Sequence, residues 1–234
     1  MSAPSRPVAV ITGASAGLGL ATAHALAARR WTLIIDARGE PALRRAAAEL
    51  GESTEVTAIA GDVSDPEHRQ QLADALPSGR LDLLVNNASL LGPSPQPALA
   101  EYPLTTLQQV YEVNVFAPLA LTQLLLPKLG DAAGIVINIS SDAAIEPYRG
   151  WGGYGSAKAA LDQLTNILGA EHPDLGVYAF DPGDMRTEMH QQAFPGEDIS
   201  DRPVPDAVTP ALLHLIDARP ASGRYQASKL GVIA

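Results

Sequence analysis

Short runs of Val, Ile and Leu alternate with Ala-rich stretches along the whole of this 234-residue sequence. Continuous apolar runs are typical of parallel strands that are covered on both faces, and the stretches between them have the length and composition of helices. The alternation predicts repeated βαβ units that build an α/β domain around a doubly wound parallel sheet. We expect strands over residues 8–12, 32–36, 56–60, 81–86, 135–140, 177–180 and 224–227, and helices over residues 19–28, 41–50, 66–75, 105–129, 154–169 and 206–218.

The length and composition predict one domain over residues 1–234. An apolar fraction of 46% is sufficient for a core on both faces of a sheet. The net charge of -10, from 26 acidic and 16 basic residues, repels phosphate backbones and anionic membrane surfaces, and no local basic patch offsets it. We therefore expect neither a nucleic-acid partner nor a membrane partner.

The absence of cysteine excludes disulfides, thiolate metal sites and cysteine nucleophiles. The five histidines are scattered without metal-ligand spacing, so we predict no metal site. The N-terminal residues contain no long apolar stretch, and polar residues and a proline interrupt the apolar run 113–126, which makes it a poor membrane span. We expect a soluble, cytoplasmic protein.

A glycine-rich turn joins the first predicted strand to the first predicted helix. Gly13, Gly17 and Gly19 follow the strand directly. Glycine permits a tight turn and close approach of the backbone to a ligand, while a helix N-terminus presents N–H groups to a phosphate. In this context the turn indicates a dinucleotide site; the alternative is a plain turn at a helix entry.

Tyr154 and Lys158 are four residues apart at the start of a predicted helix, so they share one helix face. A tyrosine ionises near pH 10, and a neighbouring ammonium favours the phenolate, which suits the pair to acid/base work. Alone, the pair could be two exposed helix residues. Ser141 lies thirteen residues before the tyrosine, with Ser140 as a nearby rival, and Asn114 lies in an apolar setting where a satisfied core amide is the alternative.

Thr12 together with the glycine turn resembles the Thr-Gly-x-x-x-Gly-x-Gly motif of the compact, single-domain short-chain dehydrogenases/reductases. The likeness continues through Asp62-Val63, through Asn86-Asn87-Ala88, where Ser89 replaces the usual glycine, and through the Pro-Gly-x-x-x-Thr pattern that ends at Thr187. The resemblance implies a Rossmann-type fold and a nicotinamide dinucleotide. It places the cofactor against Thr12, Gly13, Ser15, Gly17, Leu18, Gly19, Arg38, Asp62, Val63, Asn87, Ala88, Tyr154, Lys158, Pro182, Gly183, Met185 and Thr187.

The resemblance also implies a catalytic set of Asn114, Ser141, Tyr154 and Lys158. In the reductive direction NADPH gives a hydride to a carbonyl carbon while Tyr154 protonates the oxygen, and oxidation of the alcohol reverses these steps. Ser141 holds the substrate oxygen, Lys158 assists, and Asn114 holds a water that links Lys158 to a proton relay. Residues 186–205 are expected to cover the substrate.

The end of the second predicted strand carries two opposing signals about the cofactor. An acid such as Asp36 suits the ribose 2'-hydroxyl of NAD, whereas Arg38 suits the 2'-phosphate of NADP. By resemblance, the acid that selects NAD would fall on Ala37 and the arginine that selects NADP on Arg38. We favour NADP(H) and leave NAD(H) open, with Arg38 as a solvated loop residue as the alternative.

The expected activity is hydride transfer between NADP(H) and a small-molecule carbonyl or alcohol. Two alternatives stay open: an epimerase or dehydratase that uses bound cofactor transiently, and a non-catalytic nucleotide-sensing protein of the same fold. Family members often form homodimers or homotetramers. The apolar helix that contains residues 119–126 and the Tyr154 helix could bury against a second subunit, or they could simply cover the sheet.

Overall fold

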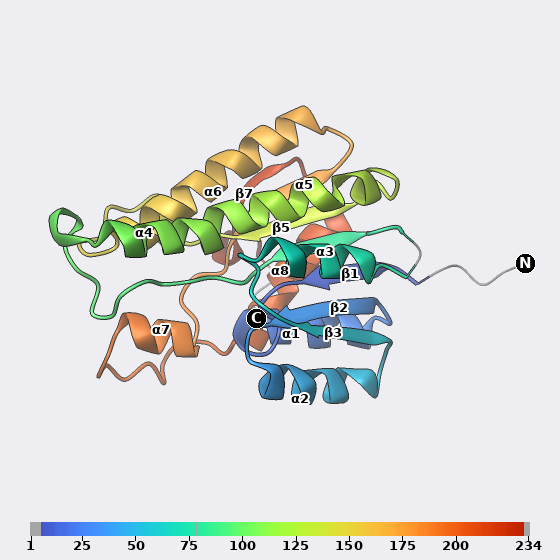
Figure 1. The fold of residues 1–234 in the computed structure, drawn as a ribbon, viewed down its shortest axis with the longest axis horizontal. Coiled ribbons are helices and arrows are strands. Elements are labelled where there is room, and N and C mark those ends of the chain that lie inside the picture. The colour runs from blue at the N-terminus through green and yellow to red at the C-terminus, as the bar shows by residue number, and fades with distance from the viewer. Residues whose placement is uncertain (1–5, 78, 232–234) are drawn as a thin grey trace, which may run out of the picture.

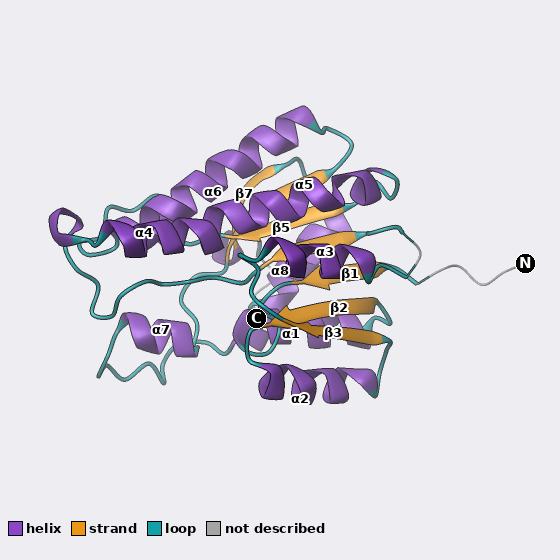
Figure 2. Ribbon diagram, in the orientation of Figure 1, coloured by secondary structure: helices purple, strands orange, loops and turns teal. Residues whose placement is uncertain are grey.

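The computed structural model describes residues 6–77 and 79–231. Within them, seven parallel strands form one sheet in the order β3-β2-β1-β4-β5-β6-β7 (Figures 1 and 2). This confirms the doubly wound α/β prediction, and each predicted strand is present. The strands are β1 (Val8–Ile11), β2 (Thr32–Ala37), β3 (Val56–Ala60), β4 (Leu83–Asn86), β5 (Ile135–Ile139), β6 (Gly176–Asp181) and β7 (Gly223–Gln226).

Helices cover both faces of the sheet because neighbouring residues of each central strand point to opposite sides. Ile11 and Ile35 pack into one apolar cluster with α1, α2 and α8, whereas Val10 and Ile34 pack into a second with α3 and α5. The helices are α1 (Gly17–Ala28), α2 (Glu40–Gly51), α3 (Pro66–Asp74), α4 (Leu104–Tyr111), α5 (Ala117–Gly130), α6 (Gly152–Glu171), α7 (Glu188–Ala193) and α8 (Thr209–Ala218).

The helix predicted over residues 105–129 is divided into α4, a π-helical turn at Glu112–Phe116, and α5. The run Leu104–Gly130 is the one stretch in the described part of the chain that is long and apolar enough to cross a membrane. It packs instead against β4, β5 and α6, which accounts for its apolar composition. A π turn inside an α-helix often marks a functional site, and this one carries Asn114.

Two helices differ from the prediction close to the carboxyl ends of the strands. Helix α6 begins at Gly152, so Tyr154 lies in its first turn. Gly155 lets this turn approach the segment after β5, since a Cβ there would lie 2.5 Å from the carbonyl oxygen of Ala143. Helix α7 was not predicted, because its six residues are too few to show a period; Thr187 caps it by accepting a hydrogen bond from the His190 N–H at 3.2 Å.

The strand order reverses between β1 and β4. From β1 the chain adds β2 and β3 on one side of the sheet, and then β4 to β7 on the other side. In open α/β sheets a crevice forms at this point, outside the carboxyl ends of the strands, and ligands bind there. The fold therefore directs the glycine turn after β1, the loop after β4 and the segment after β5 toward one place.

Candidate active site

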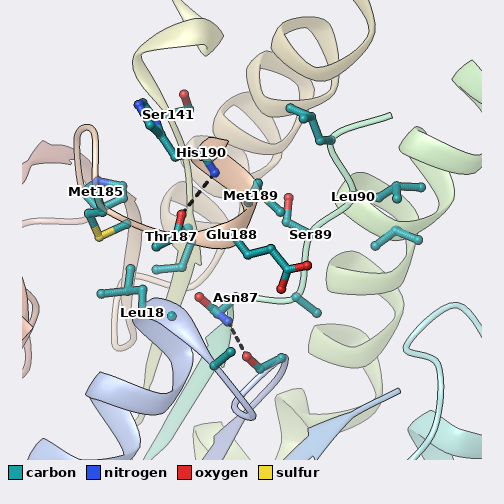
Figure 3. Close-up of a pocket in the computed structure, with 18 of the residues that line it drawn as sticks. Leu18, Asn87, Ser89, Leu90, Ser141, Met185, Thr187, Glu188, Met189 and His190 are labelled. Atoms are coloured by element: carbon teal, nitrogen blue, oxygen red, sulfur yellow. Dashed lines mark hydrogen bonds between the residues drawn. The ribbon is translucent and has the colours of Figure 1, made fainter. Parts of the chain in front are cut away.

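A cavity of about 520 Å³ occupies this crevice. The loops after β1, β2, β3, β4 and β5, the start of α6 and the segment after β6 form its walls. Figure 3 shows Leu18 and Asn87 on one side and Met185 and Thr187 on another. Most of the predicted cofactor residues line the cavity: Gly13, Ser15, Gly17, Leu18, Arg38, Asp62, Val63, Asn87, Ala88, Tyr154, Lys158, Pro182, Gly183, Met185 and Thr187.

Thr12 and Gly19, also predicted to contact the cofactor, lie behind the turn and shape it instead of lining the cavity. The Thr12 hydroxyl accepts hydrogen bonds from the backbone N–H groups of Asn87 and Ala88, each at 3.0 Å. A Cβ on Gly19 would lie 2.5 Å from Asn87 Nδ2. The close packing of the loop after β4 against the glycine turn therefore explains why position 12 is a threonine and position 19 a glycine.

Asp36 is buried within the fold, with 1% of its surface exposed. Its Oδ1 accepts the backbone N–H of Gly13 at 2.7 Å, and its Oδ2 lies 2.9 Å from Nε2 of the buried His68. Burial raises the pKa of Asp36, against the hydrogen bonds from His68 and Gly13. One carboxylate oxygen thus holds the glycine turn and the other is paired with His68, which leaves Arg38 as the charged side chain at the end of β2 that lines the cavity. The pairing with His68, 32 residues away, had no signal in the sequence.

Tyr154 and Lys158 both reach the cavity from α6, although each is at least nine-tenths buried. Lys158 Nζ donates a hydrogen bond to the carbonyl oxygen of Ile139 at 2.7 Å and lies 5.5 Å from the centre of the Tyr154 ring. The main chain at the end of β5 therefore fixes the lysine beside the tyrosine.

Burial raises the pKa of Tyr154 to about 12; the neighbouring Ser89 hydroxyl opposes the rise, and the charges of Asp142 and Asp181 add to it. The sequence indicated that a neighbouring ammonium, together with an oxidised nicotinamide, favours the phenolate, whereas burial of the phenol in the protein acts in the other direction. Desolvation is the physical reason for the difference, because a buried phenolate is poorly solvated. Burial also lowers the pKa of Lys158 to about 8, against the charge of Asp162.

Ser141 lies just beyond β5, at the edge of the cavity. Its hydroxyl donates to Asp142 Oδ1 at 3.0 Å and accepts the N–H of Ala143 at 3.2 Å. The rival Ser140 also borders the cavity but is 2% exposed, and its hydroxyl lies beside the Asp162 carboxylate. Of the two serines, Ser141 is the one with an accessible hydroxyl.

Asn114 does not line the cavity. Its Oδ1 accepts hydrogen bonds from the Leu90 N–H at 2.8 Å and the Ser89 hydroxyl at 3.1 Å, and its Nδ2 donates to the Leu90 carbonyl at 2.8 Å. The carboxamide therefore has hydrogen-bond partners in the loop after β4 and holds that loop in place. Its predicted role, to hold a water linked to Lys158, stays a prediction.

Arg224 in β7 was not predicted at the site. Its Nε donates to Asp162 at 2.9 Å, and its Nη2 donates to Asp181 and to the Ser141 carbonyl, each at 2.9 Å. The arginine thus joins α6, β6 and the segment after β5 beneath the catalytic candidates.

The far end of the cavity has an apolar and aromatic wall. Trp151 packs edge-on to the Tyr154 ring, with ring centres 5.8 Å apart, and Leu90 lies across from Met189 and His190 (Figure 3). Trp151 could be noticed from its place just before the tyrosine, but the residues of α7 carried no pattern. Among residues 6–77 and 79–231, no group of three or more His, Asp or Glu side chains is arranged to hold a metal ion.

Comparison with known proteins places this geometry in a family. A family model described as short chain dehydrogenase matches residues 7–198. Sepiapterin reductase from Bos taurus is 34% identical over 203 residues, which cover 80% of this chain and 76% of that protein. Serine 3-dehydrogenase from Agrobacterium fabrum is 39% identical over 185 residues, which cover 77% and 72% of the two chains.

Solved structures agree with the sequence comparisons. A short chain dehydrogenase from Shigella flexneri 2a strain 301, complexed with NADP, is 31% identical and superposes with a TM-score of 0.87 over 95% of this chain and 97% of that one. The matches span the glycine turn and the Tyr154–Lys158 pair. This chain therefore belongs to the short-chain dehydrogenase/reductase family and is an oxidoreductase that acts on carbonyl or alcohol groups.

Proposed function

We propose that the protein reduces a small-molecule carbonyl with NADPH and catalyses the reverse oxidation of the alcohol. One observation carries the proposal: a phenol, an ammonium and a hydroxyl, from Tyr154, Lys158 and Ser141, border the same cavity as the glycine turn. A relative solved with NADP supports the choice of cofactor. The engagement of Asp36 inside the fold supports it as well, because Arg38 then meets the 2'-phosphate without a competing acid.

The chain offers a complementary surface for each part of NADP(H). The N-terminus of α1, which begins at Gly17, would hold the pyrophosphate, and Asp62-Val63 would border the adenine. The segment from Pro182 to Thr187 would border the nicotinamide carboxamide. Bound NADPH supplies the hydride.

Tyr154 is the proton donor in this proposal. With a pKa of about 12 the phenol is protonated at neutral pH, as donation to a developing alkoxide requires. The Ser141 hydroxyl would hydrogen-bond the same substrate oxygen. Lys158, held by the Ile139 carbonyl, keeps a positive charge beside the phenol below about pH 8.

Segment 186–205, which includes α7, is the proposed substrate cover within a single domain of residues 1–234. Met189 and His190 of α7 face the cavity opposite Leu90 (Figure 3). Closure of this segment over the substrate would exclude water during hydride transfer. The ends of the proposed domain, residues 1–5 and 232–234, lie outside the described residues.

We further propose a cytoplasmic homodimer or homotetramer. Large apolar side chains are exposed on α4, the π turn, α5 and α6: Leu104, Phe116, Leu124 and Ile167. Burial of this face against a second copy would remove apolar surface from water. Analytical ultracentrifugation of wild type and Phe116→Glu tests this, since a charge in the interface should shift the protein toward monomer.

The experiment that tests the activity is a screen of ketones, aldehydes, diketones and pteridine-like carbonyls for oxidation of NADPH and of NADH. Tyr154→Phe should lose about a hundredfold or more in rate, because it removes the general acid. Tyr225→Phe is the matched control, since its exposed hydroxyl only donates to the Ala221 carbonyl. Equal rates for wild type and Tyr154→Phe would refute the mechanism.

The same screen separates the alternatives. An epimerase or dehydratase would convert its substrate without net oxidation of NADPH. A nucleotide sensor would bind NADPH and reduce none of the carbonyls.

A further inference from the structure

His68 is a buried histidine that the proposed mechanism does not use. It lies on α3 and is 3% exposed, and its ring packs so closely against Gly61 that a Cβ on Gly61 would lie 2.2 Å from His68 Nδ1. Its Nε2 lies 2.9 Å from Asp36 Oδ2, whereas its Nδ1 has no hydrogen-bond partner among the described residues. The imidazole therefore makes one polar contact within this part of the chain, and that contact is with Asp36.

Asp36 depends on the same contact for one of its two oxygens. Its Oδ1 accepts the N–H of Gly13 at 2.7 Å, and its Oδ2 is paired with His68. With a proton on Nε2, His68 supplies the donor that Oδ2 needs. A carboxylate oxygen that is buried without a donor costs free energy, so the pair stabilises this orientation of the carboxylate.

The carboxylate of Asp36 is held at the border of the cavity where the cofactor binds. Asp36 and Arg38 both line this cavity, together with the glycine turn. An acid at the end of the second strand can accept a hydrogen bond from the ribose 2'-hydroxyl of NAD(H), and its charge repels the 2'-phosphate of NADP(H). Both effects need a carboxylate that can turn toward the ribose, and Gly13 and His68 hold Asp36 in another direction.

We propose that His68 is a specificity-determining residue for the cofactor, which holds the Asp36 carboxylate away from the ribose 2'-position. Without His68, Asp36 Oδ2 regains a donor by turning toward the 2'-hydroxyl of NADH, and the same turn brings its charge toward the 2'-phosphate of NADPH. His68 itself does not line the cavity, so it is a positioning residue that acts through Asp36. The inference rests on the proposed use of NADPH and names a residue that sets this choice.

The test measures the Kd of NADPH and of NADH by fluorescence titration, without a carbonyl, for wild type, His68→Leu and His68→Gln. Wild type should bind NADPH more tightly than NADH. His68→Leu removes the donor, so the ratio of the two Kd values should shift toward NADH by about tenfold to hundredfold, the effect of one hydrogen bond to a charged group. His68→Gln places an amide N–H near the position of Nε2 and should keep the wild-type ratio.

A matched control comes from the surface of α1. His24 is an exposed histidine whose Nε2 lies 3.7 Å from Glu49 Oε2. His24→Leu makes the same change of side chain away from Asp36, so it should alter neither Kd.

Two further arms separate this role from a structural one. Asp36→Asn keeps an oxygen for the Gly13 N–H and carries no charge; because the held carboxylate does not face the ribose, this variant should keep the wild-type ratio. In an Asp36→Ala background, His68→Leu should leave the ratio unchanged, since there is no carboxylate to release. A histidine that only stabilised the fold would instead weaken the binding of both cofactors by the same factor.

The proposal is overturned if wild type binds NADH as tightly as NADPH, or if His68→Leu leaves the ratio unchanged. It is also overturned if His68→Gln shifts the ratio as far as His68→Leu does, or if Asp36→Asn alone shifts it by about tenfold or more. If His68→Leu does not fold, the ratios of His68→Gln and Asp36→Asn decide the outcome. A wild type that prefers NADPH and reduces no carbonyl fails the proposed reduction alone, because the binding ratios test His68 without a substrate.

Discussion

Replacement of Arg224 by methionine removes the charge that holds three elements together beneath the site. The Arg224 side chain is 16% exposed, and those of its partners Asp162 and Asp181 are 11% and 4% exposed. Loss of one partner of a buried ion pair costs about 3–5 kcal/mol, because the remaining charge is left buried and unpaired. For a domain of 150–250 residues, this free energy corresponds to a fall in Tm of about 6–20 °C.

A matched control is available on the surface. Arg29 pairs with Asp217 at 2.8 Å, but the two side chains are 38% and 58% exposed. An exposed pair contributes only about 0.2–1 kcal/mol, so Arg29→Met should change Tm by a few degrees at most. The comparison isolates burial, because both variants lose an arginine that is bonded to aspartate.

The pH dependence of unfolding supplies the second arm of the test. The pKa of Asp162 is already raised by burial, against the neighbouring Ser140 hydroxyl, the hydrogen bond and charge of Arg224, and the charge of Lys158. Without Arg224 the pKa of Asp162 rises further. At a pH above that pKa the carboxylate is ionised, buried and unpaired, which destabilises the folded state. As the pH falls the carboxylate takes up a proton and the destabilisation decreases. Thermal unfolding at neutral and mildly acidic pH should show the deficit of Arg224→Met shrinking on acidification. A loss no larger than that of Arg29→Met, or a deficit that widens in acid, would refute the reasoning.

Three other outcomes are expected. Gly19→Ala should destabilise the protein by about 1–3 kcal/mol, because its Cβ would lie 2.5 Å from Asn87 Nδ2. It should also weaken NADPH binding, which fluorescence titration measures. The control Gly51→Ala should do neither, since a Cβ on Gly51 would have nothing within 4 Å. Arg38→Ala should lower kcat/KM for NADPH about tenfold or more and leave the NADH value near wild type, and an equal loss with both cofactors would contradict a 2'-phosphate contact. Since the pKa of Lys158 is about 8, its ammonium is lost as pH rises through that value, so kcat for reduction should fall there; a flat profile to pH 10 would argue against a role for the charge.

The local pattern of the sequence was sufficient to predict the strands and the long helices. Strands such as β1 are buried along their whole length, so their apolar runs are continuous. Helix boundaries were less accurate because helix ends depend on packing and capping, as at Gly152 and Thr187. The π turn that contains Asn114 interrupts an apolar run without changing its composition, so the sequence predicted one unbroken helix.

The sequence by itself determined the order of the elements, the glycine turn and the Tyr154–Lys158 pair, because periodicity, turn chemistry and a four-residue helical spacing all act between near neighbours. Only the tertiary structure decided that Asp36 is bound to His68 and that Arg224 supports Ser141, since these partners lie 32 and 83 residues apart and meet through the order of the strands. It also decided the direction of the Tyr154 pKa, because desolvation depends on every element that packs around the phenol.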